Sequence, residues 1–486
     1  MVNISSSNDL KTKGVETLLG EPRKAVIKLA IPMIIAMSIT TIYNFVDTLW
    51  VSGFGANWFS VSESIELGAK AVAAVGFVLP FFMMIIALST GIGVGCGSAI
   101  SRFIGAKDKK GADNVAIHSI FITILISIVF TIPLFLLSDS LFIFIGAKEA
   151  AFLASSYGKI IFIGSFFIFF TYIANAILRG EGDAKRSMYA MMFGAGLNIF
   201  LDPVFIYIFR LGVTGAAYAT VLSMAITTLI LIYWLFFRKN TYVNFKFHGF
   251  RFNREILKDI FRVGLPASIQ QLSMSITVVI LIGFIAYIKG DEGITIYTIG
   301  WRVVTVAILP LLGMATAVVS AGGAAFGEGA FKKLKIVFYY SIKIGLIIEI
   351  IVAIITFLFA SIITSAFTTF DTDLMLLSPN IIMFLHISCF FYPGAAFGIM
   401  SSSLFQGTGK GLYSLLSTLL RTVILAPIFA AFFVFVLDLG LVGVWYAIVV
   451  ANLTGSVVSF TWCRYYINKL NHKKNLKFNT RQTFKN

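Results

Sequence analysis

The chain has little charge, few cysteines and none of the short motifs that mark an enzyme. Only 12% of its 486 residues are charged, whereas 58% are hydrophobic, and the mean hydropathy is +0.92. No P-loop, catalytic triad, metal-ligand cluster or haem motif is present, which excludes the usual signs of an ATPase or of covalent chemistry. Cys96, Cys389 and Cys463 are scattered in apolar stretches, where they indicate core residues, not disulfides or a zinc site. We therefore predict neither an enzyme nor a cofactor.

Apolar runs long enough to cross a bilayer, about 20 residues each, recur from end to end. The first 22 residues are polar and carry no secretory signal pattern, so the first apolar helix is expected to stay in the membrane. The chain is predicted to be an all-α polytopic membrane protein with two pseudo-symmetric six-helix bundles. The twelve expected helices are 24–52, 69–98, 113–138, 155–178, 186–209, 213–237, 256–288, 295–320, 335–361, 379–405, 412–437 and 441–467.

The net charge of +16 does not indicate nucleic-acid binding, because the basic residues concentrate in alternate loops. One set of loops and both termini hold 28 Lys and Arg residues, whereas the other loops hold only Lys70, Lys148, Arg210 and Lys289. Basic loops face the cytoplasm, so both termini are predicted to lie there, in a plasma-membrane protein. The basic, aromatic segment 238–255 is expected to lie on the anionic inner membrane surface.

The two halves of the chain repeat each other. Residues 30–32 match 264–266, and 211–219 match 439–447. Each half has six expected spans, so the repeat is parallel, and substrate is expected to bind between two lobes that rock against each other. A monomer suffices to form that site. The predicted divisions are a cytoplasmic N-terminus (1–23), an N-lobe (24–237), a cytoplasmic linker (238–255), a C-lobe (256–467) and a basic cytoplasmic tail (468–486).

Ionisable residues break this symmetry. A carboxylate in the hydrocarbon region costs about 3 kcal/mol, so it is expected to bind an ion or a substrate. Asn198 and Asp202, four apart, share one helix face, and Asn44 and Asp47, three apart, share another. The C-terminal counterparts of Asp47, Asn198, Asp202 and Thr220 are Leu281, Thr422, Ala426 and Ile448. The N-lobe is therefore predicted to hold the cation-binding site.

Proline adds to this predicted site. Pro203 lacks a backbone N–H, so the carbonyl of Ile199 loses its usual donor. An oxygen-rich group suited to Na⁺ or to protons would result from that carbonyl, an amide and two carboxylates. The structural alternative is that the two carboxylates only cap helix ends. Pro32, about four turns before Asp47, is either a hinge or a static kink.

Other charges within the spans give weaker signals. Glu349 lies deepest and is the best candidate for a second site in the C-lobe, and Lys343, six residues earlier, faces nearly the opposite way. Lys159, Arg302 and Arg421 are expected to snorkel to the membrane surface or to bridge helices.

Over essentially its whole length the chain resembles the multidrug and toxic compound extrusion (MATE) family, in its prokaryotic DinF-like branch. The resemblance rests on Pro32, on residues 44–48, 198–203 and 405–410, and on the turn 178–183. Glu181 departs from the pattern, because a small or apolar residue is more usual in this turn.

The resemblance implies an antiporter that exports cationic, often aromatic compounds in exchange for Na⁺ or H⁺. Asp47, Asn198, Asp202 and Thr220 would hold the coupling ion, and the first helix would bend at Pro32. The alternative is a lipid-linked oligosaccharide flippase of the same superfamily, although few arginines lie at midplane. A membrane-embedded enzyme is disfavoured because the sequence shows no catalytic cluster. A channel is disfavoured because the two lobes are asymmetric, whereas a selectivity ring normally needs symmetry about a pore.

Overall fold

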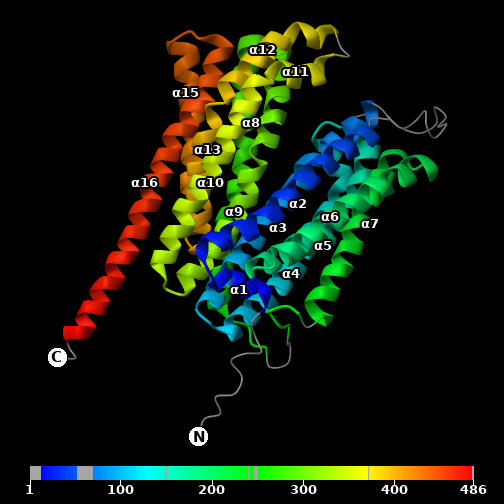
Figure 1. The fold of residues 1–486 in the computed structure, drawn as a ribbon. Coiled ribbons are helices and arrows are strands. Elements are labelled where there is room, and N and C mark those ends of the chain that lie inside the picture. The colour runs from blue at the N-terminus through cyan, green and yellow to red at the C-terminus, as the bar shows by residue number, and fades with distance from the viewer. Residues whose placement is uncertain are drawn as a thin grey trace. The chain divides into compact units, whose positions relative to one another are not determined.

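The computed structural model describes residues 12–51, 69–147, 150–238, 240–245, 250–369 and 372–483 (Figure 1). This part of the chain is mostly helical and contains no β-strand, which confirms the predicted all-α fold. Within it, eleven helices are long and apolar enough to cross a membrane. The number rises to twelve if α12 and α13, bent by 48° against each other, form one span.

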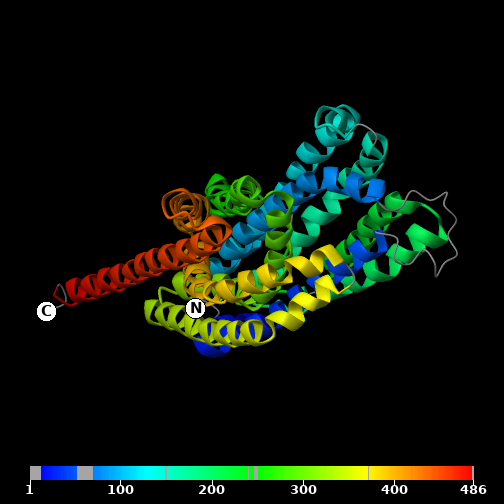
Figure 2. The same cartoon turned by 90° about the horizontal axis from the view of Figure 1, so that it is seen from above.

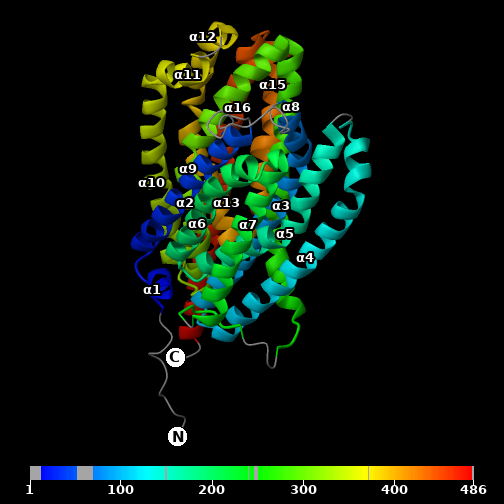
Figure 3. The same cartoon turned by 90° about the vertical axis from the view of Figure 1, so that its right-hand side faces the viewer.

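The described residues of the N-terminal half form seven α-helices and two π-helical turns. Their bounds are α1 Lys13–Leu19, α2 Pro22–Val51, α3 Ala69–Gly105, α4 Lys109–Phe144, α5 Ala151–Gly180, α6 Ala184–Pro203, η2 Val204–Ile208, α7 Gly212–Ile232 and η3 Tyr233–Phe237. The helices α4 and α5 run side by side, and α5 also packs against α7 (Figure 3). Their aromatic core includes Phe142, Phe162 and Phe169.

The C-terminal half follows the same plan with more interruptions. Its elements are α8 Arg254–Ala307, α9 Leu309–Gly327, α10 Phe331–Leu358, α11 Ala360–Thr368, α12 Thr372–Ser388, α13 Phe391–Gly407, α14 Gly411–Leu419, η4 Leu420–Ile424, α15 Leu425–Ala431, η5 Phe432–Val436 and α16 Gly440–Thr483. The expected break between 288 and 295 is a kink at Gly290, whose φ of 56° suits glycine. The expected helix 295–320 is interrupted, because α9 begins just before Pro310.

The last helix is longer than predicted. The sequence indicated an end near residue 467 and a separate tail, but α16 continues to Thr483 (Figure 2). Half of the residues from 468 to 483 are Lys, Leu, Arg or Gln, which form helices readily, so this stretch can extend a helix that is already nucleated.

The backbone repeats as the sequence does. Arg210 and Asp438 occupy matched positions and have φ values of 57° and 52°. Gly212 and Gly440, two residues further on, have φ values of 56° and 55°. Left-handed conformations are uncommon for residues other than glycine, so the match at Arg210 and Asp438 indicates a shared turn geometry.

By internal packing the described chain forms two units. Unit 1 takes its residues from Met1–Glu16, Ile35–Phe103 and Asp108–Ser268, and unit 2 from Thr17–Ile34, Ile104–Lys107 and Ile269–Asn486. The helix α2 thus passes from unit 2 to unit 1 two residues after Pro32. The lobe boundaries drawn from the sequence stay a prediction.

The segment between the lobes belongs to unit 1. The carboxylate of Glu181 accepts hydrogen bonds from the backbone N–H groups of Tyr242 (2.8 Å) and Val243 (3.2 Å). Asp113 accepts another from the N–H of Asn244 (2.7 Å). Tyr242 and Val243 are buried. Residues 240–245 therefore dock on unit 1 through their backbone. That the segment lies on the membrane surface stays a prediction, and residues 246–249 lie outside the described ranges.

Candidate functional site

The two carboxylates singled out from the sequence lie together in unit 1. Asp47 lies near the end of α2, and Asp202 lies at the end of α6, directly before Pro203. Asp202 is fully buried, and the two side chains lie within hydrogen-bonding reach of each other. The Oδ1 atom of each is buried and has no hydrogen-bonding partner among the described residues. Two ionised carboxylates repel each other at such a separation, so this arrangement requires a proton or a metal cation.

Asn198 joins this pair to α7. When its carboxamide is oriented to satisfy both ends, Nδ2 donates to Oδ2 of Asp202 at 3.0 Å, and Oδ1 accepts from the N–H of Thr220 at 3.1 Å. Asn198 and Thr220 are both buried, with exposures of 1% and 4%. The structure therefore brings together Asp47, Asn198, Asp202 and Thr220, as the sequence predicted. The helical spacing of four places Asn198 and Asp202 on one face of α6.

Asn44 is not part of this buried group. Its side chain is exposed, although it precedes Asp47 by only three residues on the same helix. Its backbone carbonyl accepts a hydrogen bond from Oγ1 of Thr48 at 2.9 Å. Two residues three apart on a helix differ in direction by about 60°, which is enough here to separate a buried from an exposed side chain.

Two tyrosines near the pair were not found from the sequence. Tyr43 and Tyr157 each interact electrostatically with both Asp47 and Asp202. Tyr43 precedes Asp47 by four residues, so the helical spacing pointed to it. Tyr157 lies on α5, and no local spacing relates it to either carboxylate. Their hydroxyl groups give the site polar neighbours that can donate hydrogen bonds.

The end of α6 is fixed by an irregular turn. The π-helical turn η2 begins directly after Pro203, where the missing N–H disturbs the regular hydrogen-bond pattern. Within this turn, the hydroxyl of Tyr207 donates to the carbonyl of Trp50 on α2 at 2.5 Å. The rings of Trp50 and Tyr207 also meet edge to face, with centroids 6.1 Å apart. These contacts hold the ends of α2 and α6, and hence both carboxylates, together.

Pro32 is buried inside α2, which remains one continuous helix from Pro22 to Val51. The removal of one backbone hydrogen bond weakens the helix at this point. The division between the two units falls between Ile34 and Ile35. The hinge role of Pro32 stays a prediction.

Unit 2 contains a buried carboxyl of its own. Glu349 on α10 has no exposed surface, and neither of its carboxyl oxygens has a partner among the described residues. Lys343 was predicted to lie on nearly the opposite face of the same helix, and its side chain is exposed. Glu349 is thus buried inside the protein, while its depth in the membrane and its role stay predictions.

The other charged residues of the spans behave differently from one another. Lys159 pairs with Asp139 at 2.7 Å and so bridges α5 and α4, as expected. Arg302 is exposed. Arg421 is only 7% exposed and lies beside Gly398 and Gly455, so it does not snorkel. It lies on the π-helical turn η4, where two glycines leave room for its side chain.

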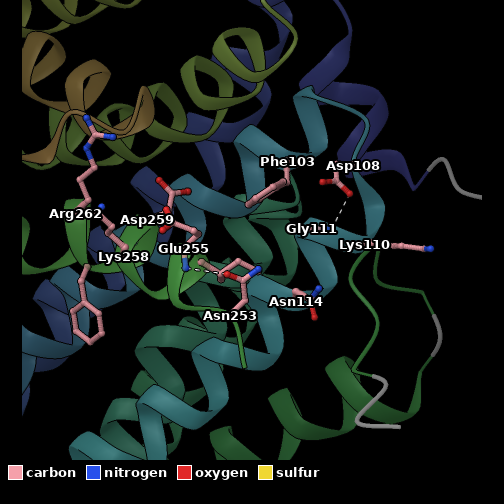
Figure 4. Close-up of a pocket in the computed structure, with 12 residues that line it drawn as sticks. Phe103, Asp108, Lys110, Gly111, Asn114, Asn253, Glu255, Lys258, Asp259 and Arg262 are labelled. Atoms are coloured by element: carbon pink, nitrogen blue, oxygen red, sulfur yellow. Dashed lines mark hydrogen bonds between the residues drawn. The ribbon is translucent and has the colours of Figure 1, made fainter. Parts of the chain in front are cut away.

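A surface cleft of about 940 Å³ lies elsewhere in unit 1 (Figure 4). Exposed side chains of both charges line it, among them Asp108, Lys110, Glu255, Lys258 and Arg262. None of the predicted site residues lines this cleft. Mixed exposed charges at the ends of helices are typical of a solvated surface, so the cleft is not our candidate site.

The chemistry that the buried group supports is the binding of a small cation. It offers two carboxyls, one carboxamide and one hydroxyl, which are oxygen ligands. Among the described residues, no group of three or more His, Cys, Asp and Glu residues could hold a metal ion. The group is thus suited to a proton or to Na⁺, and not to a transition metal that needs imidazole or thiolate ligands.

Comparison with known proteins identifies the family of the chain. The chain matches the MatE family over residues 32–204 and 266–432. It is 28% identical to "Multidrug export protein MepA" of Staphylococcus aureus (strain MSSA476), over 88% of this chain and 90% of that protein.

Two solved structures are more similar still. A crystal structure described as MATE in the straight conformation has a TM-score of 0.90 and 45% identity, and covers 95% of this chain and 100% of its own. A second, described as MATE in the bent conformation, has a TM-score of 0.88 and 44% identity, and covers 95% of this chain and 99% of its own.

Proposed function

Because the chain belongs to the MatE family of membrane transporters, we propose that it exports small organic cations in exchange for H⁺ or Na⁺. The observation that carries this proposal is the buried pair of Asp47 and Asp202, each with one unpartnered oxygen. Such a pair is costly in a membrane unless it binds and releases a cation. The multidrug export of the staphylococcal relative supports the assignment of small organic compounds as substrates.

The geometry favours the proton as the coupling ion. One proton between the carboxyls of Asp47 and Asp202 completes their hydrogen bond without any further ligand. Sodium would draw on the same oxygens, with Asn198 and Thr220 as additional ligands. Loss of the cation leaves two negative charges close together, so the site then attracts a positively charged substrate or opens to water. Cation and substrate thereby exclude each other, which is the condition for antiport.

A conformational change must accompany this exchange. Asp47 and Pro32 lie on the same helix, and Pro32 lies next to the point where α2 passes between the units. Protonation of Asp47 changes its hydrogen bonding to Asp202 and so alters the forces on this helix. A bend at Pro32 would then carry the change along α2. The straight and bent forms of the solved relatives support such a motion.

The remaining parts of the proposal concern the cell. Basic loops place both termini in the cytoplasm of a plasma-membrane protein. The buried group lies within one unit of one chain, so a monomer suffices.

The experiment is dye transport in proteoliposomes under separately imposed Na⁺ and H⁺ gradients. The wild type would be compared with Asp47→Asn and Asp202→Asn, which keep the size of each side chain but remove its charge. Asp139→Asn is the matched control, since Asp139 is an exposed carboxylate on α4 that pairs with Lys159. We expect gradient-driven transport in the wild type and the control only. Equal transport in all four proteins would contradict the proposal.

A further inference from the structure

Glu349 is buried with no partner in unit 2, far along the chain from the Asp47–Asp202 pair. It lies on α10, has no exposed surface and is not one of the residues that form an ion pair. Both carboxyl oxygens, Oε1 and Oε2, lack a hydrogen-bonding partner among the described residues. Buried carboxyls normally accept hydrogen bonds or face a cation, so this one requires an explanation.

Among the described residues, no basic side chain forms an ion pair or hydrogen bond with Glu349. The helix α10 packs against α9, α11, α12, α13 and α16. The sequences of α9 and α11 contain no titratable side chain. Tyr392 is the titratable residue of α13; it is fully buried, its hydroxyl also lacks a partner, and it interacts electrostatically with Glu349 and with the thiol of Cys389.

The other titratable groups nearby do not pair with Glu349 either. Lys343 on α10 itself is exposed. The remaining groups of these helices are Lys332, Lys333, Lys335, Tyr339 and Tyr340 on α10, Asp373 and His386 on α12, and Tyr446, Cys463, Tyr465, Tyr466 and the basic residues from Arg464 onward on α16. None of them forms a hydrogen bond or ion pair with Glu349 in the described part of the chain.

An ionised carboxylate without a partner is strongly disfavoured in such surroundings, so Glu349 carries a proton in this conformation. The protonated group makes no hydrogen bond, and an apolar side chain of the same size would pack there at lower cost. Glu349 therefore does not stabilise this conformation. A buried group whose burial is unfavourable in one state is expected to act in another, in which its proton can leave.

We propose that Glu349 is a second proton-binding site, which takes up and releases one proton in each transport cycle. Tyr392 interacts electrostatically with Glu349, and its hydroxyl is a hydrogen-bond donor that can turn toward the carboxylate once the proton has left. The proposal rests on proton-coupled export by the Asp47–Asp202 pair and adds one proton to it. The transporter then exchanges two protons, not one, for each substrate molecule. This raises the highest ratio of substrate concentrations across the membrane that it can maintain.

The test measures this ratio directly. Full-length protein in proteoliposomes would move a fluorescent cationic dye against its gradient at an imposed pH difference of about one unit, with the membrane potential clamped at zero. Each coupled proton then supports roughly a tenfold dye gradient, because one pH unit is equivalent to a factor of ten in an equilibrium. We expect Glu349→Gln to reduce the steady-state dye gradient about tenfold. Lys343→Gln, which removes an exposed charge from the same helix, should leave it unchanged.

A spectroscopic measurement separates this proposal from the proposed function. Infrared difference spectra of purified wild type and Glu349→Gln should differ by the C=O band of one protonated carboxyl, and dye binding should shift or remove that band. If the wild type maintains no dye gradient at all, the proposed coupling fails, and the infrared band alone decides whether Glu349 binds a proton. Equal dye gradients in wild type and Glu349→Gln, or identical carboxyl bands, would overturn the proposal.

Discussion

Glu181 should make the docking of the linker on unit 1 depend on pH. Its side chain is only 2% exposed. Burial raises the pKa of Glu181 from its ordinary value of 4.5 to about 8, and the carboxylate of Asp183 acts in the same direction. The backbone N–H groups of Val243 and Tyr242 and the guanidinium of Arg186 oppose this shift but do not cancel it. The buried carboxyl therefore holds its proton more tightly than an exposed one does.

The sign of the effect follows from this difference. When residues 240–245 leave unit 1, Glu181 returns to water and to a pKa near 4.5. Docking is then strongest below pH 4.5 and weakens as the pH rises through about 8. One pKa unit corresponds to about 1.4 kcal/mol, so the complete effect is roughly 5 kcal/mol. Between about pH 5 and pH 8 the docking equilibrium should fall by up to a few hundred-fold.

Limited trypsin digestion of the full-length protein measures this docking, because the segment carries Lys246 and Arg251 as cleavage sites. Wild type and Glu181→Gln would be digested side by side at each pH, so that the pH dependence of trypsin cancels in the ratio. Glutamine keeps an oxygen that accepts both N–H bonds but does not titrate. The ratio of wild-type to variant cleavage rates should rise from about pH 5 to about pH 8 and level off above that.

The control for this assay is Glu255→Gln, which removes an exposed carboxylate at the end of the same segment. Its cleavage rate should equal that of the wild type at every pH. If the ratio of wild-type to Glu181→Gln cleavage rates stays constant or falls with rising pH, the reasoning is refuted.

Two further predictions concern stability. Tyr207→Phe removes the hydroxyl that donates to the carbonyl of Trp50. Thermal unfolding of the purified protein should show a loss of stability of about 1 kcal/mol. An unchanged melting temperature would contradict this role of Tyr207. Gly105→Ala places a methyl group 2.0 Å from the carbonyl oxygen of Ala324 and should abolish well-folded expression, whereas Gly76→Ala on the same helix meets no atom within 4 Å and should be neutral or slightly stabilising. Size-exclusion profiles of the two glycine variants check this contrast, and equal profiles would contradict it.

Much of the fold could be read from the sequence because the membrane imposes simple rules. A run of about 20 apolar residues has to be helical, since no water is present to bond its backbone. Gly290, which kinks α8, and Pro310, at the start of α9, mark breaks that local chemistry explains. The length of α16 was not predictable from hydropathy, because its last residues are polar.

The candidate site was partly predictable for the same reason. Asp47 and Asp202 are conspicuous because charge is rare within spans, and helical spacing joined Asn198 to Asp202. Tyr157 and the linker anchor at Glu181 depend on contacts between distant segments, which no local pattern records. Asn44 shows that helical spacing alone does not define the site. Asp47, three residues later on the same helix, belongs to the buried group, whereas the side chain of Asn44 is exposed.

The central claim is that cation and substrate exclude each other at the Asp47–Asp202 pair. Calorimetry of dye binding to the purified transporter, in two buffers of different ionisation enthalpy at one pH, counts the protons released per dye molecule. Without Na⁺, we expect the wild type to release about one proton more per dye molecule than Asp47→Asn or Asp202→Asn, because only the wild type can release the proton of the pair. If sodium is the coupling ion, added Na⁺ should instead weaken dye binding in the wild type alone. Dye binding that releases no proton, ignores Na⁺ and is the same in all three proteins would contradict the account.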